Sequence, residues 1–314
     1  MIRYVARRLI GALPVLALIS LIAFALLQLI PGDPASVIAG ETATPAQIAQ
    51  VRVALGLDRP WYEQLGRWYA GILSGDLGTS HLLRISVGQA IAERLPVTVS
   101  LTLCALAITV PLGLGAGILA ALRPNSLVDL AVMGVSLLGI SLPGFWLGLI
   151  AIFVFAVDLN WLPVGGYQPL AAGAGAWLAS LAMPACCLGL FQVGLLARIT
   201  RATMLDTLRQ DFVRTARAKG LGEWLVIGKH ALANVMIPVM TVIGIMASLM
   251  AAGAVVIEQV FSLPGIGRLM TNAILGRDYP VIQGTLLLVA ATMVAINVAV
   301  DVIYAWLDPR IRYD

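Results

Sequence analysis

Six long apolar runs, almost free of charge, constrain this sequence more than any other feature. The first extends from Leu9 to Ile30 and holds 22 residues without a charge. As a helix with a rise of 1.5 Å per residue it is roughly 33 Å long, enough to cross a hydrocarbon core of ~30 Å. Five more runs follow, over Val97–Leu122, Leu130–Val157, Trp177–Leu196, Val239–Ile257 and Thr285–Ala305. The sequence therefore predicts an all-α, polytopic membrane protein with six transmembrane helices.

Composition supports this class. Only 11% of the residues are charged and 60% are hydrophobic, whereas a soluble domain carries about 25% charged residues. The first run follows Arg3, Arg7 and Arg8. It is too long for a signal peptide and lacks a small-residue cleavage site, so we interpret residues 1–30 as an N-terminus with an uncleaved first transmembrane helix.

The sizeable polar insert of the chain is the segment 31–96. Thr44, Pro45 and Gln47 have the spacing of an N-cap, a first-turn proline and a capping box, which predicts a short helix ending at Gly56. A second helix is predicted over Pro60–Ile72 and a third over Ser86–Leu95. Five Arg balance six acidic residues in this insert, so it is neither a polycation nor a polyanion binder.

The remaining sequence, 97–308, is predicted to form a core of five transmembrane helices, with a basic loop at about 198–238 and a short tail at 309–314. The third span contains Pro143 and Gly144. With six spans, the short loops on one face carry 13 Lys and Arg and those on the other carry two. By the positive-inside rule, the N-terminus, the basic loop and the tail are cytoplasmic, and the insert 31–96 is extracytoplasmic.

Motifs for catalysis and cofactor binding are missing. The sequence has no G-x-x-x-x-G-K-[ST] phosphate loop, and its two histidines, His81 and His230, fall on opposite sides of the membrane. We therefore expect no catalytic residue, no cofactor, no metal site and no nucleic-acid partner. Asp301 is essentially the one ionisable residue inside the six spans. Ion-driven transporters usually have more, so energy for transport is expected from a partner.

The basic loop is the candidate site for such a partner. Leu205, Leu208 and Phe212, followed by Thr215 or Ala216, recur at helical spacing and predict an apolar stripe on a cytosolic helix. Gly220 is suited to end this helix in a left-handed C-cap, and a second helix is expected from near Gly222 to just before Pro238. Two interpretations remain open from spacing alone: a small-residue knob that docks in another protein, or a loop whose cations contact lipid phosphates.

At this point the sequence resembles a known family, the ABC-transporter permeases of the dipeptide/oligopeptide/nickel importers. The basic loop is similar to their EAA loop, although Arg214 and Thr215 stand where the general motif has Glu and Ala. The resemblance covers the chain from end to end, in Arg7-Arg8, Pro31-Gly32-Asp33-Pro34, Gly75-Asp76-Leu77-Gly78, His230-Ala231-Leu232, Ile237-Pro238, Phe261-Ser262-Leu263-Pro264-Gly265-Ile266-Gly267, Arg277-Asp278-Tyr279-Pro280 and Asp308-Pro309-Arg310-Ile311-Arg312. It is strongest to the dipeptide-type first permease subunit.

The resemblance implies an ABC importer type I permease fold in a bacterial inner membrane. It further implies a second homologous permease, two cytosolic ATPase subunits, an extracytoplasmic substrate-binding protein and surrounding membrane lipid as partners. The residues implied to couple to the ATPase are Arg214, Thr215, Ala216, Arg217, Ala218, Lys219, Gly220 and Leu221. A bulky side chain at Ala216 or Gly220 is then expected to abolish transport with membrane insertion intact.

Short dipeptides or oligopeptides are the solutes that the resemblance favours. Nickel, glutathione and opine-like solutes are alternatives within the same family. A secondary transporter or channel without ATPase partners is the alternative class. The substrate-contacting residues are not indicated by any motif in the sequence.

Overall fold

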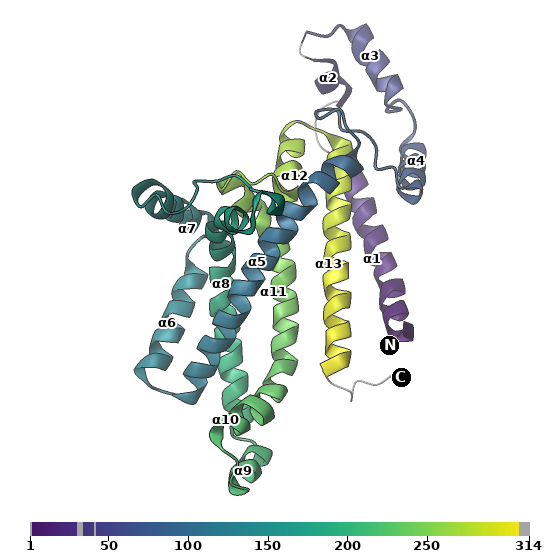
Figure 1. Cartoon of the computed structure of the whole chain (residues 1–314). Helices are drawn as coiled ribbons and strands as arrows, with labels where there is room; N and C mark the ends of the chain where they lie inside the picture. Colours follow the sequence, from purple (N-terminus) through teal and green to yellow (C-terminus); the bar gives the residue numbers. More distant parts are fainter. Residues whose placement is uncertain (1, 30–33, 41, 308–314) are drawn as a thin grey trace. The chain divides into compact units, whose positions relative to one another are not determined.

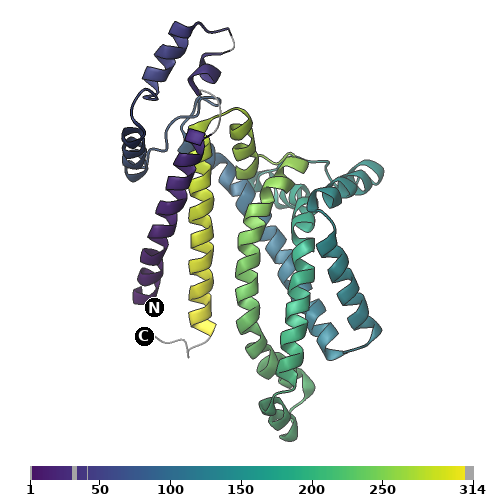
Figure 2. The ribbon, with the colours of Figure 1, turned by 180° about the vertical axis from the view of Figure 1, so that it is seen from behind.

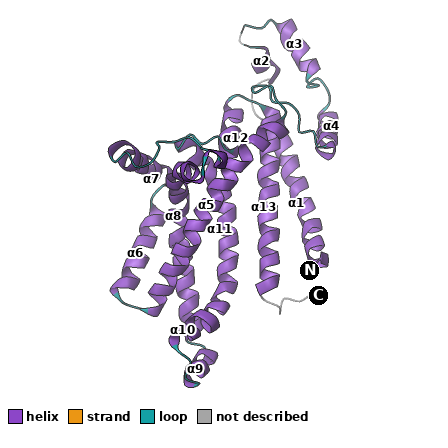
Figure 3. Cartoon of the chain, in the orientation of Figure 1, coloured by secondary structure: helices purple, strands orange, loops and turns teal. Residues whose placement is uncertain are grey.

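The computed structural model describes residues 2–29, 34–40 and 42–307. In these ranges the regular structure is helical and no strand is present (Figure 3). The N-terminal helices are α1 (Ile2–Leu29), α2 (Pro34–Ala39), α3 (Pro45–Ala54) and α4 (Trp61–Ser74). Of the family-like motif at 31–34, only Pro34, which begins α2, lies among the described residues, and the predicted tail 309–314 lies outside them.

The other elements, whose order along the chain Figure 1 follows by colour, are longer on average. They are α5 (Val87–Leu122), α6 (Leu127–Ser141), α7 (Gly144–Ala151), the π-helix η1 (Ile152–Asp158), the 3₁₀ turn η2 (Leu170–Ala172), α8 (Ala174–Leu208), α9 (Asp211–Ala218), α10 (Glu223–Leu225), the π-helix η3 (Val226–Ala231), α11 (Leu232–Val260), α12 (Ile266–Leu275) and α13 (Tyr279–Leu307).

Two compact units share the chain. The first consists of Thr98–Leu263 with the terminal stretches Met1–Ala6 and Ala295–Asp314, and the second consists of Arg7–Val97 and Pro264–Val294. Helices α5 and α13 each contribute residues to both units. The candidate site belongs entirely to the first unit.

Helix α8 is the centre of the first unit, where α6, α7 and α11 pack on it and where both views show it between α6 and α11 (Figures 1 and 2). The helices approach closely because small residues lie at the contacts. A Cβ atom on Gly194 of α8 would lie 2.7 Å from the backbone oxygen of Ser136 in α6. The apolar core between α8 and α11 includes Leu196, Met204 and Met246, all fully buried.

The predicted third span is not one straight helix. Helix α6 ends at Ser141, and Leu142 and Pro143 are extended before α7 begins at Gly144. The residue before a proline is disfavoured in helical conformation because the proline ring crowds its backbone. The predicted span over Leu130–Val157 is therefore a bent pair of helices, broken next to the Pro143 and Gly144 that lie inside it.

The second unit has its own apolar core, in which the start of α5 packs against α12 and the start of α13. Its buried residues include Val87, Leu269 and Val281. A buried carboxylate ties two of its loops together: Asp278 accepts hydrogen bonds from the Ser80 hydroxyl at 2.5 Å and from the backbone N–H of Leu82 at 3.2 Å. The C-terminal part of the polar insert is therefore packed into the core of the second unit.

Two predictions about helices in the insert have opposite outcomes. The capping box at Thr44 and Gln47 is present at the start of α3, with both reciprocal hydrogen bonds formed, so this prediction is confirmed. The short helix expected over Ser86–Leu95 is the first part of α5, which continues through Pro96 to Leu122. A proline removes one backbone donor, and the long apolar run that follows continues the helix.

Among the described residues, four helices are long and apolar enough to cross a bilayer: Val87–Leu122, Ala174–Leu208, Glu223–Val260 and Tyr279–Ile303. The bent pair Leu127–Gly139 and Gly144–Asp158 is a fifth if it forms one span. The shorter apolar segment Ile10–Ala25 lies in α1. These elements correspond in order to the six predicted transmembrane segments.

Candidate functional site

The segment Arg209–Leu225, which we call the 209–225 loop, joins α8 to α11 and projects beyond the ends of both helices (Figures 1 and 2). Helix α8 ends at Leu208, and Gln210 is extended (φ −73°, ψ 152°) before α9 begins at Asp211. The single cytosolic helix expected across Leu205–Gly220 was therefore wrong. The break separates α9 from α8, so that α9 forms a distinct knob.

A small apolar core holds the knob together. Val213 and Ala216 of α9 are buried against Val226 of η3, with Leu208 at the end of α8 packed beside them. Leu208 and Ala216 of the predicted apolar stripe lie in this core, but Val213, which is fully buried, takes the place of Phe212, which is 37% exposed. The helix break after Leu208 resets the helical phase, which is why the periodicity read through it failed.

The turn after α9 has the left-handed cap predicted at Gly220. Gly220 has φ +77°, and its N–H donates to the carbonyl of Arg217 at 2.9 Å. The N–H of Leu221 donates to the carbonyl of Ala216 at 3.4 Å. These two bonds form a Schellman motif, in which glycine is preferred because other residues are strained at positive φ. The prediction of a glycine C-cap is confirmed.

A bidentate ion pair spans this turn. The Arg217 guanidinium donates from Nε to Oε1 of Glu223 at 2.7 Å and from Nη2 to Oε2 at 3.1 Å. The hydrogen bond to this carboxylate raises the pKa of Arg217 above its usual value, so the arginine stays charged. The pair ties the end of α9 to the start of α10 and fixes the shape of the turn.

The eight predicted coupling residues are brought together on this knob. Ala216 is buried, and the other seven are exposed: Arg214, Thr215, Arg217, Ala218, Lys219, Gly220 and Leu221. Arg214 pairs only loosely with Asp211 at 3.6 Å, and the Thr215 hydroxyl donates to the Asp211 carbonyl at 2.9 Å. Ala216 therefore packs in the core of the knob, whereas Gly220 forms the turn after α9, so the two small residues have different structural roles.

Two residues of this region were missed in the sequence. Trp224 in α10 is 88% exposed, and Val213 is the fully buried centre of the knob. A tryptophan on the outer face of a protruding loop is a typical anchor of a protein interface. The presence of a tryptophan in this basic segment is the signal that could have identified Trp224. Nothing in the periodicity distinguished Val213 from its neighbour Phe212.

The second helix predicted in the basic loop does not end where expected. The helix predicted to stop before Pro238 continues: α10 and η3 lead directly into α11, and Pro238 lies inside α11. Prolines are tolerated within membrane helices, where neighbouring groups and local 3₁₀ or π geometry satisfy the freed backbone. The knob is thus joined without a break to a helix that runs on to Val260.

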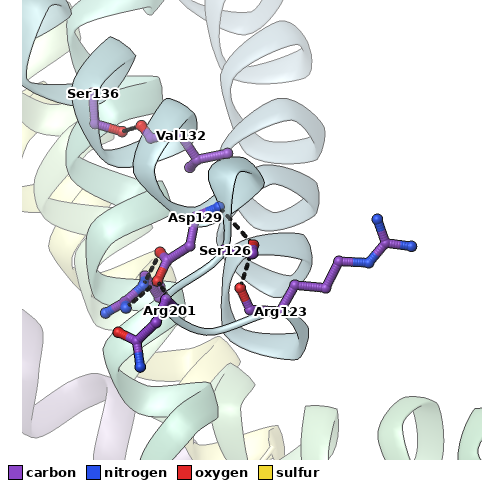
Figure 4. A network of polar contacts seen from close by, with 7 residues as sticks. Arg123, Ser126, Asp129, Val132, Ser136 and Arg201 are labelled. Carbon is purple, nitrogen blue, oxygen red and sulfur yellow. Dashed lines mark hydrogen bonds and ion pairs between the residues drawn. The ribbon is translucent and has the colours of Figure 1, made fainter.

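Basic residues N-terminal to the loop have a separate, structural role. Arg201 of α8 donates from Nε and Nη2 to the two carboxylate oxygens of Asp129 in α6, each at 2.5 Å (Figure 4). Asp129 also accepts from the backbone N–H of Asn125 at 3.0 Å, and Ser126 caps α6 beside it. This pair joins two helices of the bundle and is not a part of the exposed knob.

Two models of known families match the sequence. Residues 113–313 match the binding-protein-dependent transport system inner membrane component. Residues 1–102 match the N-terminal region of the binding-protein-dependent transport system membrane component. Together these matches include the 209–225 loop and nearly all of the chain.

Curated relatives extend over the whole length. A putative peptide transport system permease protein of Brucella abortus is 49% identical over 99% of both chains. The dipeptide transport system permease protein DppB of Alkalihalophilus pseudofirmus is 39% identical over all of both chains. The glutathione transport system permease protein GsiC of Escherichia coli O6:H1 is 42% identical, also over all of both chains.

A solved structure has a similar fold. A chain of the MetNI methionine ABC transporter, in an inward facing conformation, superposes with a TM-score of 0.58 at 17% identity. It covers 70% of this chain and 97% of its own length. The similarity concerns the fold alone.

Proposed function

This chain belongs to the family of binding-protein-dependent transport system inner membrane components, and on that basis we propose that it imports short peptides and is driven through its 209–225 loop. As a permease subunit of an ABC importer, it is a non-catalytic, multi-pass protein of the inner membrane. ATP is hydrolysed by partner subunits. The expectation of a permease with a type I importer fold is confirmed.

One observation carries the role of the loop: the knob has its own core and still leaves large apolar side chains exposed. Phe212 and Leu221 are each 37% exposed and Trp224 is 88% exposed, beside the cations Arg214 and Lys219. A self-supported knob with an aromatic anchor and charges at its rim has the composition of a protein interface. We prefer this interpretation to a loop that contacts lipid phosphates because the knob has its own apolar core. We therefore propose that the ATPase contact lies at Arg214–Leu221 and extends to Trp224.

The family works with ATPase subunits, a substrate-binding protein and a second permease. We propose in detail that a homologous permease completes the pathway, that two cytosolic ATPases drive it, and that an extracytoplasmic binding protein delivers the solute. The distribution of Lys and Arg supports an orientation with both termini and the 209–225 loop in the cytoplasm.

Short peptides are the proposed solute class because relatives named for peptide and dipeptide transport match the full length. Glutathione is the second candidate, supported by the relative at 42% identity. Uptake assays with the cognate binding protein, offered dipeptides, tripeptides and glutathione in competition, decide between them. Failure of every peptide to compete for uptake would contradict the peptide proposal.

The ATPase contact is tested by a matched pair of tryptophan substitutions. Trp224→Ala removes the exposed side chain of the knob, and Trp61→Ala removes a 62% exposed tryptophan of the second unit. We expect Trp224→Ala to weaken ATPase binding by tenfold or more, on the order of 2 kcal/mol for an aromatic anchor. The measurement is co-purification and binding of the ATPase in detergent.

The Trp61→Ala variant should retain the ATPase fully, because its side chain lies in the other unit. Equal ATPase binding by both variants would exclude the knob as the docking surface. A chain that transports solute with no ATPase bound would instead support the secondary-transporter alternative.

A further inference from the structure

A pocket of about 410 Å³ lies within the first unit, between α7, α8 and α11. Its volume is in the roughly 300–1,000 Å³ range of small-molecule sites. Its lining is apolar except for two groups, the thiol of Cys187 and the carboxamide of Gln192. Gln192 is near the middle of α8, at comparable distances from Ala174 and Leu208. The sequence offered no motif for this site.

Gln192 is 4% exposed, and its carboxamide oxygen has no hydrogen-bond partner among the described residues. A buried acceptor without a donor is costly, because it has lost its hydrogen bonds to water. Three lining residues of the pocket, Phe145, Leu249 and Val256, are each about half exposed. The pocket is therefore open at the surface of this chain, and its lining includes Gln192, whose buried oxygen has no partner.

We propose that this pocket is a contact site on the solute pathway, where Gln192 accepts a hydrogen bond from a backbone N–H of a passing peptide. The inference rests on the peptide-import function proposed above. A peptide offers N–H donors and apolar side chains, which match one neutral acceptor in an apolar wall. No charged residue lines the pocket, so a metal ion finds no counter-charge there.

The experiment uses the complete importer with its partners, reconstituted in vesicles. Uptake of trialanine is compared with uptake of its analogue methylated on both peptide nitrogens, each supplied on saturating binding protein. In Gln192→Met the ratio of the two rates should fall about tenfold from the unaltered chain, as expected for one lost hydrogen bond. The methylated solute has no such bond to lose, so its rate stays the same.

The ratio separates a contact from a structural role, because misfolding slows both solutes equally. Gln192→Glu keeps an acceptor oxygen and should retain the original ratio. Gln259→Leu, which alters an exposed glutamine of α11 outside the pocket, should retain it too. An unchanged ratio in Gln192→Met, or an equal change in Gln259→Leu, overturns the proposal.

Two further outcomes have distinct meanings. Loss of the second permease from Gln192→Met during co-purification would mean that the donor comes from that subunit, and would overturn the solute contact. If the unaltered importer takes up no trialanine, the peptide function itself fails. If it takes up trialanine and the ratio in Gln192→Met is unchanged, only the role of Gln192 fails.

Discussion

Two arginine–carboxylate pairs in this protein have the same bidentate geometry and opposite surroundings. Arg201 and Asp129 join α8 to α6, with side chains 24% and 6% exposed. Arg217 and Glu223 join α9 to α10, with side chains 42% and 60% exposed. The residues of the first pair are 72 positions apart in the sequence, and those of the second are six apart.

The difference shows that the basic segment consists of two parts with different roles. Its N-terminal part, at Arg201, is a structural clamp within the helix bundle, where partial burial reduces the screening of the pair by water. Its central part, around Arg217, shapes an exposed turn, where an ion pair contributes little to stability. The positive-inside pattern counts both arginines equally, although only the second lies on the surface proposed to bind the ATPase.

Breaking the buried pair is expected to have the largest effect. Asp129→Asn leaves the Arg201 guanidinium without a counter-charge in a mostly buried place, and such losses are strongly destabilising. We expect the thermal unfolding midpoint of the chain in detergent to fall by about 5–10 °C. Static light scattering or a thiol-reactive dye measures the transition.

The double variant with Asp129→Leu and Arg201→Met is the control for this prediction. Replacing both partners of a buried pair by apolar residues removes the uncompensated charge, so most of the lost stability should return. A double variant as unstable as Asp129→Asn would contradict the interpretation of the pair as a clamp.

The contrast also indicates where sequence reasoning succeeds in this protein. The transmembrane segments and the Thr44 cap were predictable because charge-free length and capping spacing are local properties. The partnership of Arg201 with Asp129 was not, because it depends on how α6 packs against α8. The bend at Pro143 had a local signal in the sequence, the proline itself. The break after Leu208 had none, because nothing marks Gln210 as extended.

Val213 in the knob and Gln192 in α8 illustrate the same limit. Burial of Val213 rather than Phe212 depends on the reset of helical phase at Gln210, which only the fold reveals. Gln192 is an isolated polar residue in an apolar run, and its unpartnered oxygen is a property of its neighbours. The residues proposed to couple to the ATPase could be named from the family resemblance, since they lie contiguously in the sequence, and their coupling role stays a prediction.

Straining the turn that brings Arg217 to Glu223 should have an intermediate effect. Gly220→Ala places a Cβ in open space but at φ +77°, which costs roughly 1 kcal/mol or more of the local stability of the knob. Hydrogen exchange across 211–226 should become faster, and ATPase affinity should fall severalfold.

A second glycine provides the matched control for this strain. Gly228 in η3 also has open space around it and no positive φ, so Gly228→Ala should leave exchange and affinity unchanged. Equal effects of the two substitutions would show that the conformation of Gly220 does not matter. The larger Gly220→Trp should abolish transport with membrane insertion intact, and normal uptake by that variant would contradict the coupling role.

The smallest effect is expected at the exposed pair itself. Glu223→Gln removes the charge of the carboxylate and keeps a hydrogen-bonding oxygen near Arg217, so the thermal midpoint should change by less than about 2 °C. Because salt screens exposed charges over roughly 8–10 Å at ordinary ionic strength, raising the salt concentration should diminish even this change. The same salt should diminish the penalty of Asp129→Asn less, because partly buried pairs are screened less than exposed ones. If salt abolished both effects alike, the two pairs would be equivalent, and the division of the basic segment into a clamp and a docking knob would be wrong.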